Sequence, residues 1–270
     1  MNKSKFDIVK EISLPKRGDS LDNPAKYPAE FKLPPLESIP GKYINTLYAP
    51  KDITVDWNAY KDYLSQVKPD FHPHVLFVGH DSSEIENITL MSLGGVLQHM
   101  NGIANYALVG SSNINLLDDI IKSKQPEWIG FNLYTGLTDF VFEWIKRYKI
   151  ERASHILKKN ILDFDTADRL LKDMVREAKG PVYDGSQLLY APIIIGGHFN
   201  NYSFNESYSR GGDYVVRGKG INILRDILLG LYSPGVYHDP MPYANIPRMD
   251  REAFYSDMYA FSDKTKGYVF

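Results

Sequence analysis

The chain has 270 residues, 43% of them hydrophobic and 24% charged, which is enough to bury the core of one large domain. Its 31 basic and 33 acidic residues give a net charge of −2, so charge gives no reason to expect nucleic acid or an anionic membrane as the main partner. Cysteine is absent, which excludes disulfides, cysteine-ligated zinc and a cysteine-held iron–sulfur cluster within these residues.

Residues 1–70 differ in character from the rest of the chain. The stretch 16–51 is rich in proline and polar residues and has no sustained hydrophobic period, which predicts an extended N-terminal arm. One helix is expected at 56–67, with Asp56 as its N-cap. Its expected apolar face consists of Tyr60, Tyr63, Leu64 and Val67.

From residue 71 onward, short apolar runs alternate with stretches of helical spacing. Strands are expected at 75–78, 104–109, 128–133, 193–195 and 213–217. Helices are expected at 88–100, 116–121, 138–150 and 221–231. This alternation predicts an α/β fold: a doubly wound five-stranded parallel sheet with helices on both faces, in the flavodoxin-like order 2-1-3-4-5.

Two further segments complete the expected domain organisation. Residues 151–189 do not fit the minimal fold and are interpreted as an insertion beside the sheet, with one helix at 166–179. The main domain then covers 71–235. Residues 236–270 are expected to form a C-terminal linker toward a catalytic domain that these residues do not contain.

Glycines follow two consecutive strands of the expected sheet, as Gly196-Gly197 and as Gly218-Lys219-Gly220. Positions without side chains at the carboxyl ends of parallel strands let a large ligand approach the backbone. The second turn precedes a helix, so it also offers backbone N–H groups to a phosphate or amide oxygen. The same edge carries no obvious nucleophile, which indicates binding rather than catalysis.

Four segments carry a family resemblance: the loops 79–83, 132–136 and 196–200, and the strand and turn 213–220. Taken in this order, they resemble the cobalamin-binding domain found at the N-terminus of B12-dependent radical SAM enzymes. In that family a strand ending in Gly-Gly is followed by a polar segment and a D-Y-V-V-x-G-x-G-like strand and turn, which is similar to residues 193–220. The segment Ile246-Pro247-Arg248-Met249-Asp250 resembles the P-x-x-D linker of such enzymes. The resemblance covers residues 74–255 and implies a Rossmann-like domain that binds cobalamin.

Three departures from the family pattern refine this expectation. Many cobalamin domains carry D-x-H-x-x-G after the first strand, whereas Ser83 stands here in the place of the histidine, so base-off cobalamin without a histidine lower ligand is implied. Asn132-Leu133-Tyr134 replaces a serine-x-leucine motif. Because the cluster cysteines are missing, S-adenosylmethionine and a [4Fe–4S] cluster would belong to a catalytic radical SAM domain acting in cis or in trans.

The resemblance implies a cofactor-binding edge with no catalytic residue and no protein metal ligand. Its expected members are Gly79, His80, Asp81, Ser82, Ser83, Asn132, Leu133, Tyr134, Thr135, Gly196, Gly197, His198, Phe199, Gly218, Lys219 and Gly220. The corrin is expected over the first loop and Tyr134, and the nucleotide tail over Gly196 and Gly197. A Gly197→Leu variant is expected to lose the corrinoid and to stay folded.

Other functions stay open beside a module for methyl transfer or related radical chemistry. The chain can be a stand-alone corrinoid carrier or sensor, or a flavodoxin-like module that binds a flavin, a nucleotide or a protein. No G-x-G-x-x-G follows a strand, there is no P-loop, and Asn132 stands where a receiver domain has its acceptor aspartate. Since neither a secretory signal nor a membrane helix is recognisable, a cytoplasmic location is expected.

Overall fold

The structure is a computed structural model that describes residues 57–80, 87–135, 138–239 and 247–261, with the side chains of 239 and 258–261 left aside. Its main sheet has six strands, namely β1 (His74–His80), β2 (Ile103–Val109), β3 (Trp128–Asn132), β6 (Ile193–Gly196), β7 (Tyr214–Gly218) and β8 (Gly235–Asp239). All neighbouring pairs are parallel, in the order β2-β1-β3-β6-β7-β8. The expected parallel α/β sheet is therefore confirmed.

The expected number of strands is wrong, because β8 adds a sixth strand beyond the five in the predicted order. The prediction relied on fully apolar runs such as 193–195, which are buried on both faces. Strand β8 lies at the edge of the sheet, and residues 235–238 are only half-buried. A half-exposed edge strand carries no continuous apolar run, so the criterion could not detect it.

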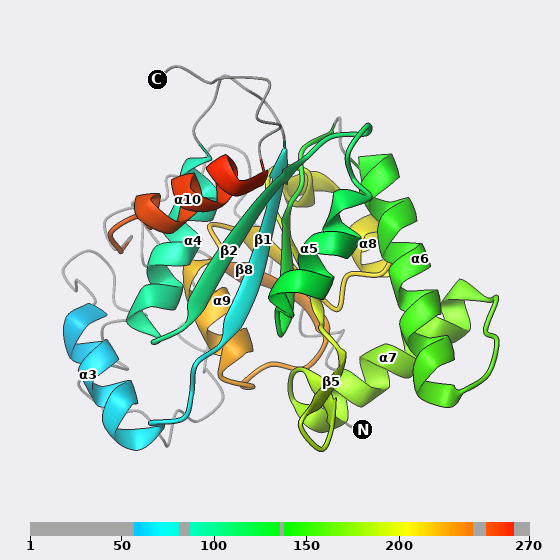
Figure 1. Cartoon of the computed structure of the whole chain (residues 1–270), viewed down its shortest axis with the longest axis horizontal. Coiled ribbons are helices and arrows are strands. Elements are labelled where there is room, and N and C mark those ends of the chain that lie inside the picture. Colours follow the sequence, from blue (N-terminus) through cyan, green and yellow to red (C-terminus); the bar gives the residue numbers. More distant parts are fainter. Residues whose placement is uncertain (1–56, 81–86, 136–137, 240–246, 262–270) are drawn as a thin grey trace, which may run out of the picture. The chain divides into compact units, whose positions relative to one another are not determined.

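The helices of the described residues are α3 (Trp57–Val67), α4 (Ile88–His99), α5 (Leu116–Lys124), α6 (Thr138–Leu157), α7 (Phe164–Ala178), α8 (Asn200–Ser209), α9 (Ile221–Leu228) and α10 (Arg251–Phe261). Helices α4 and α9 cover one face of the sheet, and α5, α6 and α8 cover the other (Figure 1). Phe131 on β3 packs against Trp144 of α6, with ring centroids 5.7 Å apart. The two helical layers make this a doubly wound sheet.

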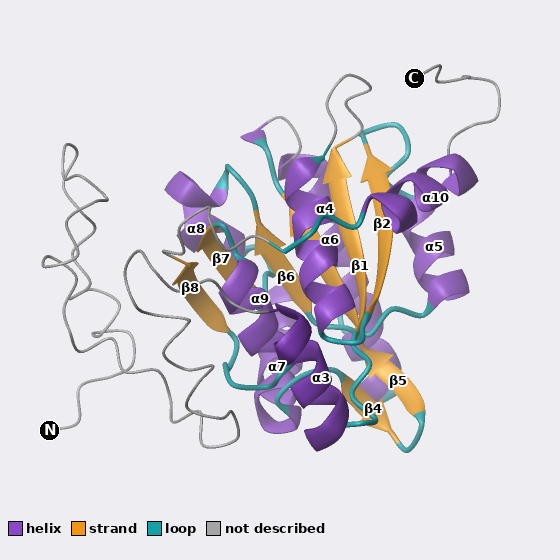
Figure 2. Cartoon of the chain, turned by 90° about the vertical axis from the view of Figure 1, so that its left-hand side faces the viewer, coloured by secondary structure: helices purple, strands orange, loops and turns teal. Residues whose placement is uncertain are grey.

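A helix and a hairpin lie in segments where the sequence patterns do not predict them. Helix α8 begins in the polar segment after Gly-Gly and buries only Asn200 and Ser207, so it shows no apolar stripe. The insertion contains, besides the expected helix α7, an antiparallel hairpin of β4 (Val182–Asp184) and β5 (Gln187–Tyr190). Figure 2 shows this hairpin at the end of the sheet where the strands begin, opposite the arrowheads of β1 and β2.

Helix α3 agrees with the helix expected at 56–67, although Asp56, its expected N-cap, lies outside the described residues. Trp57, Tyr60 and Leu64 are buried. Val67, assigned to the apolar face, is 48% exposed because it closes the last turn.

The stretch expected to form a linker, 236–270, contains β8 and α10. Asp250 accepts hydrogen bonds from Tyr106 Oη (3.0 Å) and Gln98 Nε2 (2.7 Å). Asp257 Oδ2 accepts from the main-chain nitrogen of Tyr106 (2.8 Å) on the edge strand β2. An edge strand leaves such N–H groups unpaired, so this segment closes one edge of the sheet. The aspartate of the P-x-x-D resemblance is therefore an anchor on β2 and α4.

Candidate functional site

The carboxyl ends of the parallel strands gather most of the expected site residues at one edge. Asn132 at the end of β3 is in register with Gly196 at the end of β6. Neighbours in register project from the same face of a sheet. The Asn132 amide reaches Asn87, the N-cap of α4, so this is the face that α4 and α9 cover.

Gly196 provides an open position on this face. Among the described residues other than its chain neighbours, the atom nearest to a Cβ built on Gly196 would be the carbonyl oxygen of Phe131, at 3.9 Å. Beside the neighbouring strand β7, a Cβ on Gly220 would lie 3.5 Å from Val216 Cγ1 and 3.9 Å from Leu93 Cδ2. The start of α9 therefore lies close to the middle of α4. We define the rim site as Asn132, Gly196, Val216 and Gly220.

Two further glycines of the expected site, Gly79 and Gly197, are packing positions. A Cβ on Gly79 would lie 2.6 Å from Asn87 Nδ2 and 2.8 Å from Leu90 Cδ1, so α4 already fills this position. Gly197 has φ +99°, and its Cβ would lie 2.5 Å from the main-chain nitrogen of Leu133. The expectation that Gly197→Leu stays folded is therefore wrong, because the side chain would push the backbone after β3 aside.

Main-chain hydrogen bonds join the loop after β3 to the loop after β6. The nitrogen of Leu133 donates to Gly196 O (2.9 Å), and the nitrogen of Phe199 donates to Leu133 O (3.1 Å). The side chain of Leu133 is buried, and Phe199 packs near Phe142 with ring centroids 6.2 Å apart. Leu133 and Phe199 thus hold the two loops together.

Asn132 contributes a buried amide with an exposed neighbour. Its Nδ2 donates to Asn87 Oδ1 (3.2 Å) and lies 3.5 Å from Tyr134 Oη. Tyr134 is 41% exposed and Thr135 is also exposed, so both face solvent beside the rim site. No sequence pattern singles out Asn87 as a site residue. It could have been found as the asparagine that directly precedes the helix after the first strand, where the loop from that strand ends.

The turn after β7 has the backbone that the two glycines predict. Gly218 and Gly220 have φ of 82° and 76°, and Gly220 is the N-cap of α9. The nitrogen of Gly218 donates to Asn201 Oδ1 (3.4 Å), while Lys219 is half-buried. The turn therefore leads directly into α9, and its last residue, Gly220, lies next to Val216.

Arg217, which the sequence analysis did not assign to the site, lies at the end of β7 beside this turn. Its guanidinium lies over the Phe204 ring, 4.3 Å from the centroid, and Nη2 donates to Asn201 O (3.3 Å). Partial burial lowers the pKa of Arg217, and within the described part of the chain it forms no ion pair. Because it packs on α8, Arg217 lies on the face of the sheet opposite the rim site.

The remaining expected site residues lie at the same edge or outside the described residues. His80 ends β1 and is half-buried. His198 is exposed and lies edge-on to Tyr202, with ring centroids 5.7 Å apart. Asp81, Ser82 and Ser83 lie in the segment that the structure does not describe.

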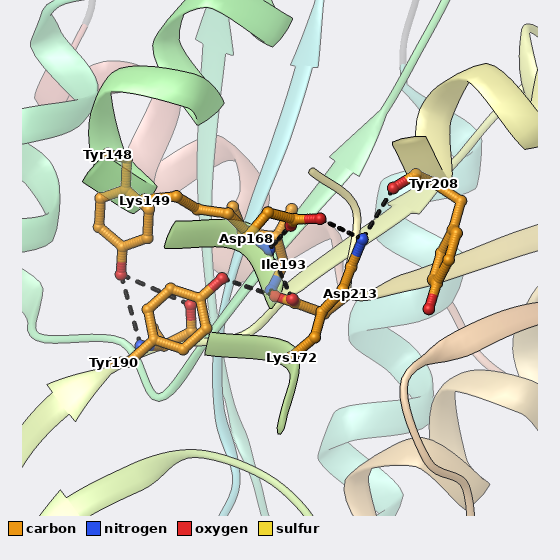
Figure 3. Close-up of polar contacts among 9 residues, drawn as sticks. Tyr148, Lys149, Asp168, Lys172, Tyr190, Ile193, Tyr208 and Asp213 are labelled. Atoms are coloured by element: carbon orange, nitrogen blue, oxygen red, sulfur yellow. Dashed lines mark hydrogen bonds and ion pairs between the residues drawn. The ribbon is translucent and has the colours of Figure 1, made fainter. Parts of the chain in front are cut away.

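A second polar cluster lies at the opposite edge, where β6 and β7 begin (Figure 3). Lys149 Nζ, fully buried, lies 2.6 Å from both Asp168 Oδ1 and Asp213 Oδ1. Asp213 Oδ2 also accepts from Tyr190 Oη (2.6 Å) and from the nitrogen of Ile193 (2.8 Å). Lys172 binds the other oxygen of Asp168 (2.7 Å), and burial, followed by the charge of Lys149, lowers the pKa of Lys172. We call these five side chains (Lys149, Asp168, Lys172, Tyr190 and Asp213) the buried charge network.

Buried tyrosines make the fold sensitive to alkali. Burial is the largest cause that raises the pKa of Tyr148 to about 12, and it raises the pKa of Tyr190 well above 10. A group whose pKa is higher in the folded state stabilises the fold fully below its unfolded pKa, near 10, and loses this contribution as the pH rises toward the folded value. We expect Tyr148 alone to remove on the order of 2 kcal/mol of unfolding free energy between about pH 10 and 12.

Urea unfolding at pH 9 and pH 11 tests this expectation, with tyrosinate absorbance recorded in parallel. The urea concentration at the unfolding midpoint should be lower at pH 11 than at pH 9. The tyrosinate absorbance of the buried tyrosines should appear only as the protein unfolds. A midpoint that does not change between the two pH values would contradict it.

A shallow depression also lies at this opposite edge, between α3 and α4. Its lining residues are Lys61, Ser65, Pro69, His72, Gln98, Asn101 and Gly102. Asn101 there already donates to Ser65 Oγ (2.7 Å), and its carbonyl lies 3.0 Å from His72 Nδ1. Because these polar groups satisfy one another, the depression is a weaker candidate than the rim site.

Among the described residues, no helix has both the length and the apolar character needed to cross a bilayer. The sequence matches no protein-family model, and it matches neither a curated protein nor a solved structure.

Proposed function

We propose that this chain is a cobalamin-binding module that receives the nucleotide tail of base-off cobalamin at the rim site. The observation that carries the proposal is the open position at Gly196, next to the buried Asn132 amide, at the carboxyl edge of a parallel sheet. Ligands of open α/β sheets bind outside this edge. A long tail rich in oxygen atoms needs a floor without side chains and hydrogen-bonding groups beside it, and the rim site offers both.

The residues around the rim site suit the separate parts of the cofactor. The Asn132 amide, in register with the open position, and the exposed Thr135 after β3 are the groups that we assign to polar atoms of the tail. The turn of Gly218–Gly220 at the start of α9 suits its phosphodiester, because main-chain N–H groups at a helix N-terminus favour an anion. Tyr134 and His198 present exposed ring surface to the corrin.

One side of the edge is less suited to a ligand. The position at Gly79 is filled by Asn87 and Leu90 of α4, so the space between β1 and β3 is closed on this face. The proposal therefore places the tail over β6 rather than over β1. Ser83, which stands in the histidine's position in the family motif, supports binding without a histidine lower ligand.

When bound, cobalamin supplies a cobalt centre for methyl transfer or related radical chemistry, while the protein binds and orients it. We propose that the module serves a B12-dependent radical SAM enzyme in the cytoplasm. Support comes from the similarity of residues 193–220 and 246–250 to that family. Because the chain has no cysteine, the cluster and S-adenosylmethionine would belong to a catalytic domain in cis or in trans. A corrinoid carrier or sensor without catalytic activity is the alternative.

Retention of hydroxocobalamin tests the proposal. We expect the protein, mixed with excess hydroxocobalamin and desalted, to keep the corrin absorption band at about one equivalent, because a site that encloses the tail releases it slowly. A parallel sample receives flavin mononucleotide. Retention of the flavin and not of the corrinoid would contradict the proposal and favour the flavodoxin-like alternative.

A further inference from the structure

The side-chain amide of Asn132 has a fixed orientation. Its Nδ2 donates to Asn87 Oδ1 (3.2 Å), and that same oxygen accepts from the main-chain nitrogen of Leu90 (3.3 Å). The bond from Leu90 fixes the oxygen of Asn87, so a flipped Asn132 amide would turn one oxygen toward another. The hydrogen-bond network therefore places Asn132 Nδ2 on the side of β1 and Asn132 Oδ1 on the side of β6.

The oxygen of this amide is an acceptor beside the open position. A Cβ on Gly197 would lie 2.5 Å from Asn132 Oδ1, so the oxygen faces the end of β6, where Gly196 has no side chain. Asn132 is only 4% exposed, and among the residues that the structure describes none donates to Oδ1. Those side-chain atoms of the described chain that are both fully buried and unpartnered lie on other residues, so this oxygen keeps contact with solvent.

We infer that the rim site takes a hydrogen-bond donor, and that Asn132 Oδ1 accepts from a ribose hydroxyl of the nucleotide tail. The inference rests on the proposed function. Within the nucleotide of cobalamin, the phosphodiester oxygens only accept and the base has no N–H group, so the ribose hydroxyls are its donors. A serine, as in the family motif, can donate or accept because its hydroxyl rotates, whereas the fixed amide of Asn132 only accepts at this side. The ribose then lies beside β3 and β6, and the phosphodiester is left for the turn after β7.

An Asn132→Leu variant removes the acceptor and nearly keeps the volume of the side chain. Helix α4 keeps its cap, because Asn87 Oδ1 still accepts from Leu90. The ribose hydroxyl would lose its acceptor in an enclosed site, so we expect hydroxocobalamin to bind about tenfold more weakly. Asn132→Ala, which cannot clash with its neighbours, should show a loss of similar size. Isothermal titration measures the affinity, and circular dichroism checks the fold.

Three controls make the result specific. Dicyanocobinamide, which lacks the nucleotide, should bind wild type and Asn132→Leu within about twofold of each other. Asn87→Ser still caps α4 but shortens the side chain that holds Asn132 Nδ2. Because Asn132 keeps its oxygen there, the loss should be smaller than that of Asn132→Leu. Asn115→Leu places the same apolar side chain at the exposed start of α5 and should leave binding unchanged.

Each outcome decides a different point. If the Asn132 variants bind hydroxocobalamin as tightly as the wild type, or lose both corrinoids equally, the role of Asn132 is overturned while the proposed function stands. A loss in Asn87→Ser as large as that in Asn132→Leu would also overturn it, because the broken bond between the two asparagines would then explain both results. If the wild type binds neither corrinoid, the proposed function fails and the role of Asn132 fails with it.

Discussion

A Gly196→Leu variant is expected to lose hydroxocobalamin binding by about 10- to 100-fold while keeping its fold. The new side chain would occupy the open position beside Asn132, where the nearest non-neighbouring atom of the described residues to a Cβ is Phe131 O, at 3.9 Å. Gly196 is not among the glycines with positive φ, so leucine adopts its backbone without strain. The loss would therefore come from filling the space for the tail. Isothermal titration with hydroxocobalamin measures it, and circular dichroism checks the fold.

Two control variants show whether the loss of binding depends on where the side chain is added and on its size. Ser186→Leu adds the same side chain in the exposed turn of the β4–β5 hairpin, at the other edge of the sheet, and should not affect binding. Gly196→Ala adds only one methyl group and should show an intermediate loss. Unchanged affinity in a folded Gly196→Leu protein would mean that the tail does not lie over β6.

An Asp213→Ala variant is expected to lower the free energy of unfolding by about 3–5 kcal/mol. The substitution leaves the fully buried ammonium of Lys149 with only Asp168 as a partner. It also leaves Tyr190 Oη and the nitrogen of Ile193 without their acceptor. Most of this cost comes from the buried polar groups that lose their partners. The network also joins β6, β7, α6 and α7. Urea denaturation monitored by circular dichroism measures the change.

Asp173→Ala provides the matched control on α7. Asp173 pairs with Arg176 at the surface, where both side chains are about half exposed. An exposed pair of this kind contributes about 0–1 kcal/mol, so this variant should behave almost as the wild type. Equal effects of the two aspartate substitutions would show that the buried charge network does not stabilise the fold.

The strands on the inside of the sheet were predictable because burial on both faces selects continuous apolar runs. Ile193–Gly196 and Trp128–Asn132 follow this rule, and their parallel arrangement follows from the helices between them. The edge strand β8 and the polar helix α8 were missed for the same physical reason, since neither buries enough apolar surface to leave a period in the sequence.

The site was predictable as an edge but not as a set of contacts. Gly196 and Gly197 are adjacent and identical in sequence, yet only the first faces open space, and this difference depends on φ and on atoms of β3. The bond between Asn87 and Asn132 requires β1 and β3 to be neighbours. Lys149 and Asp213, 64 residues apart, look like ordinary surface charges in the sequence. Such pairings are set by tertiary packing, which a local pattern does not contain.

In the proposed binding mode, the tail of the cofactor leaves cobalt and enters the rim site beside Gly196. Electron paramagnetic resonance of the protein with one equivalent of cob(II)alamin tests it most directly, because an axial nitrogen splits each cobalt line and an oxygen ligand or a vacant position does not. We expect a bound spectrum without nitrogen splitting. A bound spectrum that keeps the splitting of the nucleotide base on cobalt would contradict it.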